Sequence, residues 1–492
     1  MDISAHFTSN VFDVETLEVD GQTESVIRGG RHLFGLLPQA LDGVRRIGVI
    51  GWGSQGPAQA QNLRESLAGT DIALTVGLRA GSSSMAEAEA AGFSTADGTL
   101  GEMFPVIADS DLVLLLISDA AQAELYPQIF AALRPGSTLG LSHGFLLAHL
   151  RNEGASFPPG VNVIAVCPKG MGPSVRRLYE QGREINGAGI NASFAVEQDI
   201  DGRATDIALA WSIALGSPYT FKTTMESEFR SDVFGERGIL LGAIHGIVEA
   251  LFRRYQDLGA TPEEAFRRST ESVTGPISRA ISREGIDGLV ELLGDADRAV
   301  FDEAYSATYP AARQVLEEIY DEVASGNEIR SVVLAGERLQ RSPMPAIENS
   351  AMWRVGAAAR ASRDGQPTLI DPFTAGVFAA TMVAQVDVLY AHGHPWSEIA
   401  NESVIEAVDS LLPYMHARGV AYMVDNCSTT ARLGSRKWAP RFDYALCQSV
   451  FPTVDNGGTP NPAVLAELQS HPLHEVLREV GKLRPAVDIS VA

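Results

Sequence analysis

The chain has 492 residues, of which 45% are hydrophobic and 20% charged, a composition typical of a soluble globular protein with two or three domains. The formal net charge of −23 argues against a general nucleic-acid binder, because no basic stripe is available to neutralise phosphates. The chain has 3 cysteines without a CxxC spacing, which excludes a disulfide scaffold and a cysteine zinc site and fits a reducing compartment.

The N-terminal residues, Met-Asp-Ile-Ser-Ala-His, lack the basic and apolar regions of a secretory signal. No apolar run approaches the length of a membrane span. We therefore expect a cytoplasmic protein with neither a membrane nor a nucleic acid as partner. The alternative is a plastid stromal protein whose transit peptide has been removed.

A glycine turn follows the first strongly predicted strand. Residues 45–50 predict a buried strand, and Pro57 opens an Ala/Gln-rich helix over residues 58–67. A strand, a glycine turn and a helix in this order form the dinucleotide fingerprint, in which the backbone approaches a pyrophosphate at the helix N-terminus. The alternative is an ordinary glycine turn, which the flanking elements disfavour. The predicted cofactor-binding residues of this turn are Gly51, Trp52, Gly53, Ser54, Gln55 and Gly56.

The second strand, predicted over residues 72–76, lacks the acid that holds the ribose hydroxyls in NAD-binding relatives. Arg79, Ser82 and Ser84 follow it instead. An arginine with neighbouring hydroxyls suits the 2′-phosphate of NADPH, which we predict as the cofactor. The alternative is a surface turn with a solvated arginine.

Polar residues follow three further predicted strands, over residues 112–117, 137–141 and 161–166. In an open parallel sheet, the ligand crevice lies at the carboxyl ends of the strands. His143 and Lys169 are therefore candidates to face the nicotinamide or the substrate, although a lone histidine or lysine after a strand can equally be structural. Further predicted cofactor contacts are Ser118, Gln122 and Gly144.

After about residue 225 the pattern becomes helical, notably over residues 232–258 and 373–391. Two acidic pairs, Asp232/Glu236 and Glu402/Glu406, have the spacing that puts both carboxylates on one helix face. Like charges so placed repel unless a cation lies between them, and four hard oxygen donors suit Mg²⁺ or Mn²⁺. The alternative is a solvated acidic helix face, which the apolar neighbours of both pairs disfavour.

The helical half also contains a faint internal repeat. Asp232-Val-Phe-Gly-Glu-Arg-Gly resembles Asp371-Pro-Phe-Thr-Ala-Gly, and the segments that begin at Leu258 and His392 resemble each other. The repeats have diverged in complementary ways. The first has Arg268 and Ser272 where the second has Glu402 and Glu406, and the second has Ala375 where the first has Glu236.

A complete four-carboxylate site therefore requires both repeats to pack together, and the alternative is a chance similarity of amphipathic helices.

We expect a Rossmann domain over residues 1–224 and two helical repeats over residues 225–366 and 367–492. Residues 341–368 are expected to connect the repeats, and a helix followed by an extended end is expected from Leu465. Ser428, in a polar stretch after the second acidic pair, is a candidate to contact substrate, or else belongs to a capped loop.

Several of these motifs together resemble ketol-acid reductoisomerases in their long, plant-type form. They are Gly-Trp-Gly-Ser-Gln-Gly-Pro-Ala-Gln-Ala-Gln-Asn-Leu-Arg, Ser-His-Gly-Phe, Asp-Val-Phe-Gly-Glu, Asn-Glu-Ser-Val-Ile-Glu-Ala-Val-Asp-Ser and Asp-Asn-Cys-Ser-Thr-Thr-Ala-Arg-Leu-Gly-Ser-Arg-Lys-Trp. The resemblance implies an α/β Rossmann domain that binds NADPH, followed by an all-α domain that is duplicated, knotted and binds two Mg²⁺. It also implies a homo-oligomer, for which a dimer is one form.

The resemblance assigns a role to each candidate residue. The family's metal carboxylates match Asp232, Glu236, Glu402 and Glu406, and its substrate-binding serine matches Ser428. Its 2′-phosphate site matches Arg79, Ser82 and Ser84, and its polar residues near the reacting centre match His143 and Lys169. The implied substrate is a 2-acetohydroxy acid, 2-acetolactate or 2-aceto-2-hydroxybutyrate, and the product is a 2,3-dihydroxy acid of valine and isoleucine synthesis.

The chain departs from the plant-type pattern at Ala80, where a lysine is usual, so the 2′-phosphate is expected to be held less tightly. Two other functions fit parts of the chain. A hydroxy-acid dehydrogenase would need no metal, and a non-catalytic NADP-binding sensor would bind NADPH without Mg²⁺-dependent turnover.

Overall fold

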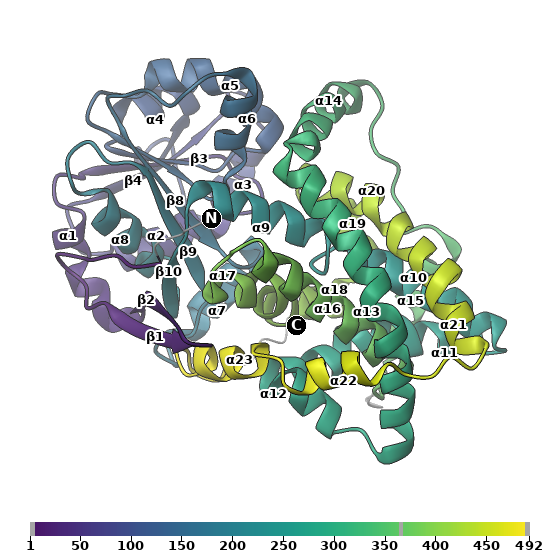
Figure 1. The fold of residues 1–492 in the computed structure, drawn as a ribbon. Coiled ribbons are helices and arrows are strands. Elements are labelled where there is room, and N and C mark those ends of the chain that lie inside the picture. The colour runs from purple at the N-terminus through teal and green to yellow at the C-terminus, as the bar shows by residue number, and fades with distance from the viewer. Residues whose placement is uncertain (1–4, 364–367, 488–492) are drawn as a thin grey trace. The chain divides into compact units, whose positions relative to one another are not determined.

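The computed structural model describes residues 5–363 and 368–487, which form two compact units. The α/β unit comprises residues 5–229 together with residues 479–487, and the helical unit comprises the described residues between 230 and 478. The C-terminal segment returns to the α/β unit, where Arg28 Nη1 donates to the Lys482 carbonyl at 2.8 Å. An α/β Rossmann-like unit followed by a helical unit confirms the predicted fold class (Figure 1).

One ten-stranded sheet organises the described part of the α/β unit, in the spatial order β1-β2-β10-β9-β8-β7-β6-β3-β4-β5. Its strands are β1 Glu15–Val19, β2 Gln22–Arg28, β3 Arg46–Ile50, β4 Ala73–Leu78, β5 Leu100–Glu102, β6 Leu112–Leu115, β7 Thr138–Leu141, β8 Asn162–Pro168, β9 Ala192–Gln198 and β10 Tyr219–Lys222. The strands from β8 to β5 run parallel, whereas β9 is antiparallel to β8 and β2 is antiparallel to β10.

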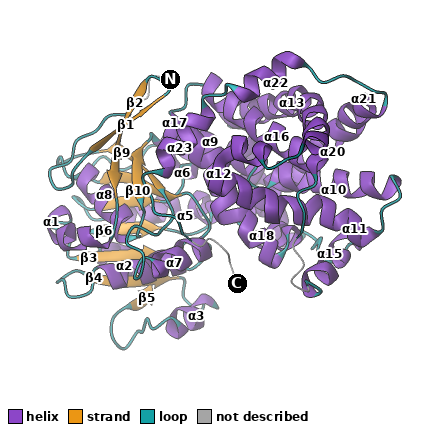
Figure 2. Cartoon of the chain, turned by 90° about the horizontal axis from the view of Figure 1, so that it is seen from below, coloured by secondary structure: helices purple, strands orange, loops and turns teal. Residues whose placement is uncertain are grey.

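Both faces of this sheet are covered by helices, as Figure 2 shows for the orange strands. Leu112 and Leu114 of β6 pack into a core that includes residues of α2 and α8, whereas Val113 and Leu115 pack into a second core with residues of α4, α5 and α6. Successive residues of a strand point to opposite faces, so a strand buried on both sides consists of apolar residues throughout. The helices are η1 Arg31–Leu36, α1 Leu37–Ala40, α2 Gly56–Ser66, α3 Ser84–Ala90, α4 Met103–Asp109, α5 Asp119–Ala132, α6 Phe145–Glu153, α7 Gly172–Gln181 and α8 Ala204–Ala214.

The five strands expected from apolar runs are present, with ends that differ by a few residues. The sequence analysis did not anticipate β1, β2, β5, β9 and β10. β1 and β2 have the sequences Glu-Thr-Leu-Glu-Val and Gln-Thr-Glu-Ser-Val-Ile-Arg, in which charged residues interrupt the apolar pattern. Such strands form here because they pair at the edge of an existing sheet, a tertiary effect that local patterning does not contain.

The helical unit repeats one unusual series of elements. A five-residue α-helix is followed by two π-helical turns, first as α11, η2 and η3 and again as α17, η4 and η5. π-Helical turns are rare and frequently lie at functional sites, so their recurrence in the same order supports a duplication. These elements span Pro262–Phe266, Arg267–Glu271, Val273–Ile277, Trp396–Ala400, Asn401–Ile405 and Ala407–Leu411.

The remaining helices complete this unit (Figure 1). They are α9 Met225–Arg237, which begins in the α/β unit, α10 Gly242–Asp257, α12 Ser278–Glu291, α13 Asp295–Ala324, α14 Asn327–Arg341, α15 Ala351–Ala361, α16 Pro372–Ala391, α18 Leu412–Arg418, α19 Val420–Asn426, α20 Thr429–Ala445, η6 Leu446–Val450, α21 Phe451–Asp455, α22 Pro462–Gln469 and α23 Leu473–Gly481.

Three local expectations were wrong. The helix expected over residues 232–258 is two helices, α9 and α10. The helix breaks because the Ile239 amide donates to Gln385 Oε1 (2.7 Å) instead of to a carbonyl of its own helix. The connection expected over residues 341–368 contains α15, although residues 364–367 lie outside the described part. The tail contains two helices, α22 and α23, rather than one, and residues 488–492 of the expected extended end lie outside the described part.

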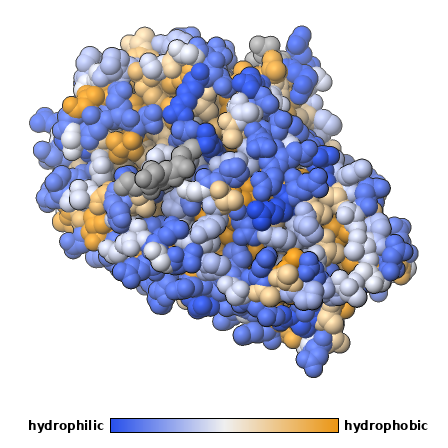
Figure 3. Space-filling view, in the orientation of Figure 1, coloured by the Kyte–Doolittle hydropathy of each residue, from blue (hydrophilic) through white to orange (hydrophobic). Residues whose placement is uncertain are grey.

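Among the described residues, α16 is the one helix long and apolar enough to cross a membrane. Within its most apolar window, 89% of the residues are buried in the structure, and α16 packs along α13. This burial is that of a core helix. The face drawn in Figure 3 is mostly hydrophilic, with hydrophobic residues scattered in small groups.

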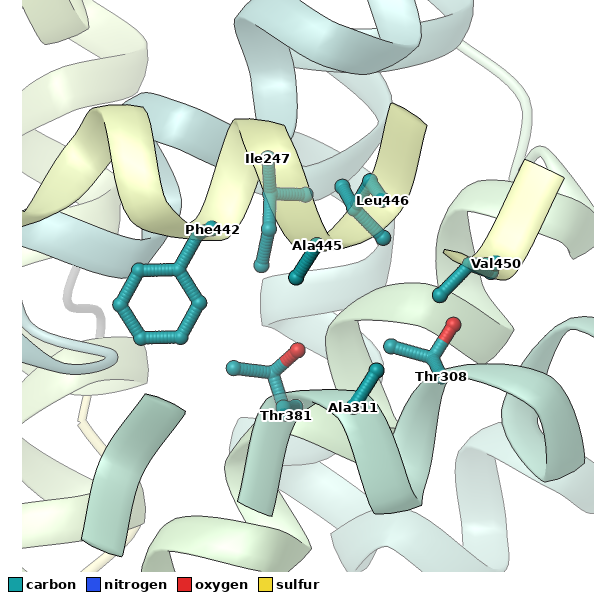
Figure 4. Close-up of a pocket in the computed structure, with 9 residues that line it drawn as sticks. Ile247, Thr308, Ala311, Thr381, Phe442, Ala445, Leu446 and Val450 are labelled. Atoms are coloured by element: carbon teal, nitrogen blue, oxygen red, sulfur yellow. The ribbon is translucent and has the colours of Figure 1, made fainter. Parts of the chain in front are cut away.

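A small cavity in the helical unit lies between α10, α13, α16 and the end of α20, as Figure 4 shows. Apolar side chains line it, together with the hydroxyl-bearing side chains of Thr308 and Thr381. No charged side chain lines this cavity, so it offers no site for an acidic substrate or for a metal ion.

Candidate functional site

The glycine turn between β3 and α2 has the geometry that close approach of a phosphate requires. A side chain at Gly51, where φ is 113°, would place Cβ 2.7 Å from the Leu116 carbonyl oxygen, and one at Gly56 would lie 2.3 Å from the Gly51 carbonyl oxygen. A Cβ at Gly53 would instead meet no atom within 4 Å. The backbone at Gly53 is therefore open at the N-terminus of α2, where a pyrophosphate is favoured.

The segment after β8 lies directly against this turn. Gln55 Nε2 donates to the Gly170 carbonyl at 2.9 Å, and a Cβ at Gly172 would lie 1.9 Å from the Ser54 carbonyl oxygen. Ser54 is exposed, whereas the Trp52 ring is buried edge-on against Phe93, with centroids 5.5 Å apart. Trp52 therefore contributes to the turn mainly by packing.

The loop after β4 presents an exposed arginine. The Arg79 side chain makes no hydrogen bond or ion pair with the residues that the structure describes, and its carbonyl accepts from the Ser82 amide at 3.1 Å. The Ser84 amide donates to Ser82 Oγ at 3.3 Å, and both serines are half-buried. The loop is thus held by its own hydrogen bonds and leaves the guanidinium available to an anion.

The carboxyl ends of β6, β7 and β8 bring the other predicted residues of this unit together. His143 Nδ1 lies 3.8 Å from Asp119 Oδ1, and the side chain of Gln122 donates to the Ile117 carbonyl at 3.0 Å. Ser118 is the exposed residue immediately before α5. These positions agree with the rule that polar side chains gather at this edge of a parallel sheet.

Lys169 and Glu228 form a buried ion pair, with Nζ 3.7 Å from Oε1 and side-chain exposures of 2% and 1%. The second oxygen of Glu228 accepts from the Gly144 amide at 2.7 Å. Any side chain at Gly144 would place Cβ 2.5 Å from the Met225 carbonyl oxygen, so glycine is required for this approach. A charged pair is tolerated in such an enclosed place because its two charges offset each other.

Glu228 is not among the functional residues predicted from the sequence. It precedes Asp232 by four residues, as Asp232 precedes Glu236, so a three-carboxylate series at helical spacing was present in the sequence. Its pairing with Lys169 depends on the tertiary structure, because the two residues are far apart in the chain.

In the helical unit, the two predicted acidic pairs lie close together. A Cβ at Gly235, between Asp232 and Glu236, would lie 3.3 Å from the backbone carbonyl oxygen of Glu402. Gln385 links the same elements, since its Nε2 donates to the Glu402 carbonyl at 3.2 Å while its Oε1 accepts from the Ile239 amide. Asp232 and Glu236 are half-buried, and Glu402 and Glu406 are 0% and 9% exposed.

The thiol of Cys427 lies near both acidic pairs. Loss of hydration, and next the negative charge of Glu236, raise the pKa of the Cys427 thiol to about 12, with further contributions from Glu406 and Asp232. Members of both acidic pairs therefore act on one thiol. Ser428, the next residue, is exposed, and its Oγ accepts from the Ala431 amide at 3.0 Å as the N-cap of α20.

The donor set fits Mg²⁺ in chemistry, because hard carboxylate oxygens are its usual protein ligands. Within the described residues, however, no three His, Cys, Asp or Glu side chains are arranged to hold one ion as they stand.

The repeat aligns Asp371 with Asp232 and Arg268 with Glu402, and Asp371 and Arg268 form an ion pair. Arg268 Nε donates to Asp371 Oδ2 at 2.7 Å, and the Tyr255 hydroxyl donates to Asp371 Oδ1 at 2.6 Å. The Asp371 amide donates to Ser272 Oγ at 2.8 Å. Arg268 corresponds in the repeat to Glu402, so a guanidinium takes the place that a predicted metal ligand has in the other repeat.

Two family models match the chain. Residues 41–220 match the "Acetohydroxy acid isomeroreductase, NADPH-binding domain" and residues 225–364 match the "Ketol-acid reductoisomerase, C-terminal domain". The chain is 58% identical to a chloroplastic ketol-acid reductoisomerase of Spinacia oleracea over 99% of this chain and 83% of that protein. It is 57% identical to the chloroplastic protein of Pisum sativum over 99% of this chain and 86% of that protein.

Two more distant relatives have names that state NAD(+) or NADH, whereas the N-terminal family model is named for NADPH. A ketol-acid reductoisomerase (NAD(+)) of Desulfosudis oleivorans is 36% identical over 64% of this chain and 89% of its own length. The solved structure of an NADH-preferring ketol-acid reductoisomerase from an uncultured archean has a TM-score of 0.56 and 23% identity, covering 71% of this chain and 99% of that one. At that identity the likeness shows the shared fold alone.

Proposed function

The chain belongs to the ketol-acid reductoisomerase family, and we propose that it converts 2-acetolactate or 2-aceto-2-hydroxybutyrate into a 2,3-dihydroxy acid of valine and isoleucine synthesis. The observation that carries this proposal is the proximity of two acidic pairs, from segments far apart in the chain, around Gly235 and Cys427. A dehydrogenase that uses no metal would not need four carboxylates there.

The proposed cofactor is NADPH rather than NADH. The β4 strand is followed by the exposed guanidinium of Arg79 and by two serines, with no acid for the ribose hydroxyls. One relative is named for NAD(+) and the matching N-terminal family model for NADPH, so this loop is the part of the chain that must discriminate. Ala80 adds no charge, which leaves Arg79 as the principal cation for the phosphate.

The proposed metal ligands are Asp232, Glu236, Glu402 and Glu406, which would hold two Mg²⁺. When bound, the ions polarise the carbonyl and hydroxyl oxygens of the substrate as Lewis acids. The chain's own contribution is to keep these oxygen donors together in a largely buried place, where electrostatic interactions are stronger than in water.

The proposed reaction has two steps. Migration of the alkyl group to the adjacent carbonyl carbon turns the substrate's hydroxyl into a 2-keto group, and the proton that this hydroxyl loses balances the proton that the former carbonyl oxygen takes up. NADPH would supply the hydride that reduces the new 2-keto group, whose oxygen takes up a proton from solvent. Lys169 Nζ carries protons in a buried place and is held by Glu228, while Asp119 lies beside His143. We assign Lys169 and His143 to the reacting centre as hydrogen-bond donors, and Ser428 to the substrate.

The deciding experiment measures NADPH oxidation with 2-acetolactate, with and without Mg²⁺. Turnover that requires both supports the proposal. Metal-independent oxidation would instead indicate a hydroxy-acid dehydrogenase, and NADPH binding without turnover would indicate a sensor.

Three further proposals follow from the family. The part of the chain after residue 224 derives from two repeats, predicted over residues 225–366 and 367–492, and the recurrent π-helical series within residues 230–478 supports this duplication. The protein forms a homo-oligomer, as the family resemblance implies. The names of the two plant relatives favour the plastid alternative over the cytoplasmic location expected from the sequence.

A further inference from the structure

A fully buried guanidinium stands beside one of the proposed metal ligands. The Arg237 side chain is 0% exposed at the end of α9, and its Nη1 donates to Glu236 Oε2 at 2.8 Å. Its Nε donates to Glu328 Oε2 at 2.8 Å, and its Nη2 lies 3.4 Å from the Thr430 carbonyl oxygen. A buried charge of this kind needs partners on every side, which Arg237 has.

Glu328 is the counter-charge, and it is itself held by two other donors. Its Oε1 accepts from Lys437 Nζ at 2.5 Å and from Trp438 Nε1 at 3.0 Å, and the residue is 1% exposed. A continuous series of charged hydrogen bonds therefore runs from Lys437 through Glu328 and Arg237 to Glu236. Each member orients the next, because a bond to an ionised group is stronger and more directional than a neutral one.

One face of α20 is shaped around this guanidinium. Thr430, Gly434, Lys437 and Trp438 have the spacing of a single helix face, and three of them supply a hydrogen-bond partner to Arg237 or Glu328. Gly434 supplies space, because a Cβ there would lie 2.8 Å from Arg237 Cζ. Even an alanine at position 434 would displace the guanidinium or the helix.

We propose that Arg237 is a positioning residue of the metal site, which fixes the carboxylate of Glu236 through Oε2, and that Glu328 and Lys437 hold Arg237 for this purpose. The inference rests on the proposed role of Glu236 as a metal ligand. Groups that orient a metal ligand commonly contribute 10–100-fold to metal affinity. Arg237 and Glu328 carry opposite charges, so the pair adds no net charge to the site and acts through geometry.

The test is the double variant Arg237→Met/Glu328→Met. It preserves the net charge and removes the two inner members of the charged series, and replacement of buried ions of both signs by apolar side chains is commonly tolerated by the fold. The outer members, Lys437 and Glu236, have side-chain exposures of 40% and 19% and keep access to water. The control is Arg441→Met/Glu318→Met, which removes an Arg–Glu ion pair between α20 and α13 that is about half exposed and does not contact Glu236. Mg²⁺ affinity is measured by calorimetry without substrate or cofactor, and the Mg²⁺-induced shift in Tm is measured beside it.

We expect the double variant to bind Mg²⁺ about 10–100-fold more weakly and the control to bind like the parent protein. Saturating Mg²⁺ should restore much of the turnover, which a general loss of folding would not allow. Gly434→Ala should weaken Mg²⁺ binding in the same direction while it retains every polar group. An unchanged affinity in the double variant would overturn the inference.

Failure of the underlying function has a different signature. Parent protein that binds no Mg²⁺, or Glu236→Gln protein that binds it as the parent does, would remove Glu236 from the metal site and with it the proposed function. Loss of Mg²⁺ binding in Glu236→Gln together with full affinity in the double variant would leave the function standing and refute only the role of Arg237.

Discussion

Replacement of Arg79 by alanine should separate the two nicotinamide cofactors. The guanidinium is exposed and pairs with no described residue, so its removal should leave the free energy of unfolding nearly unchanged. A hydrogen bond to a charged group contributes about 1.5–3 kcal/mol, which corresponds to a loss of roughly 10- to 150-fold in affinity. Only NADPH carries the 2′-phosphate, so NADH binding should change little.

The assay is a fluorescence titration of Arg79→Ala with each cofactor, together with the kinetics of NADPH oxidation. The matched control is Arg45→Ala, since Arg45 is also exposed but precedes β3, at the opposite end of the strand from the glycine turn. Equal losses for NADPH and NADH, or a loss in Arg45→Ala as large as in Arg79→Ala, would refute the assignment of the 2′-phosphate to this loop.

Three other changes probe the helical unit. Glu402→Gln should lower turnover of 2-acetolactate by more than the 10–100-fold that is typical when a residue supporting a metal ligand is replaced. It should lower reduction of 3-hydroxy-3-methyl-2-oxobutyrate less, because that step needs only one polarised carbonyl. Equal losses in the two assays would contradict this separation of the two steps. Arg268→Met should lower the free energy of unfolding in urea by about 1–2 kcal/mol because it leaves the mostly buried Asp371 without its cation, while Arg267→Met, at an exposed pair, should cost less than about 0.5 kcal/mol. Burial lowers the pKa of His416 from 6.5 to about 4, so the unfolded chain takes up a proton at a higher pH than the folded chain does. The free energy of unfolding should therefore fall by up to about 3 kcal/mol as the pH drops from about 6.5 to 4. His416→Gln should flatten this part of the curve of stability against pH, and an unchanged curve would assign the acid sensitivity to another group.

The sequence alone determined the α/β fold of the first unit where the local signal was strong. A buried central strand must be apolar throughout, and the glycines at 51 and 56 are required by contacts too short for any side chain. The strands β3, β4, β6, β7 and β8 were therefore predictable. The edge strands β1 and β2 were not, because their pairing partners and not their composition make them strands.

Spacing and repeat divergence in the sequence also singled out four carboxylates as candidate metal ligands, namely Asp232, Glu236, Glu402 and Glu406. The sequence did not determine their supporting partners. Arg237 and Glu328 are 91 residues apart, and Lys169 and Glu228 are joined only when β8 and the start of α9 meet.

Tertiary structure also decided where the helices break. Periodicity extends across residues 238–241, but an amide that bonds to Gln385 instead of to its own helix ends α9 there. Helical periodicity reports which face of a segment is buried. It carries no information on a distant side chain that competes for a backbone hydrogen bond, and such competition occurs only after the chain has folded.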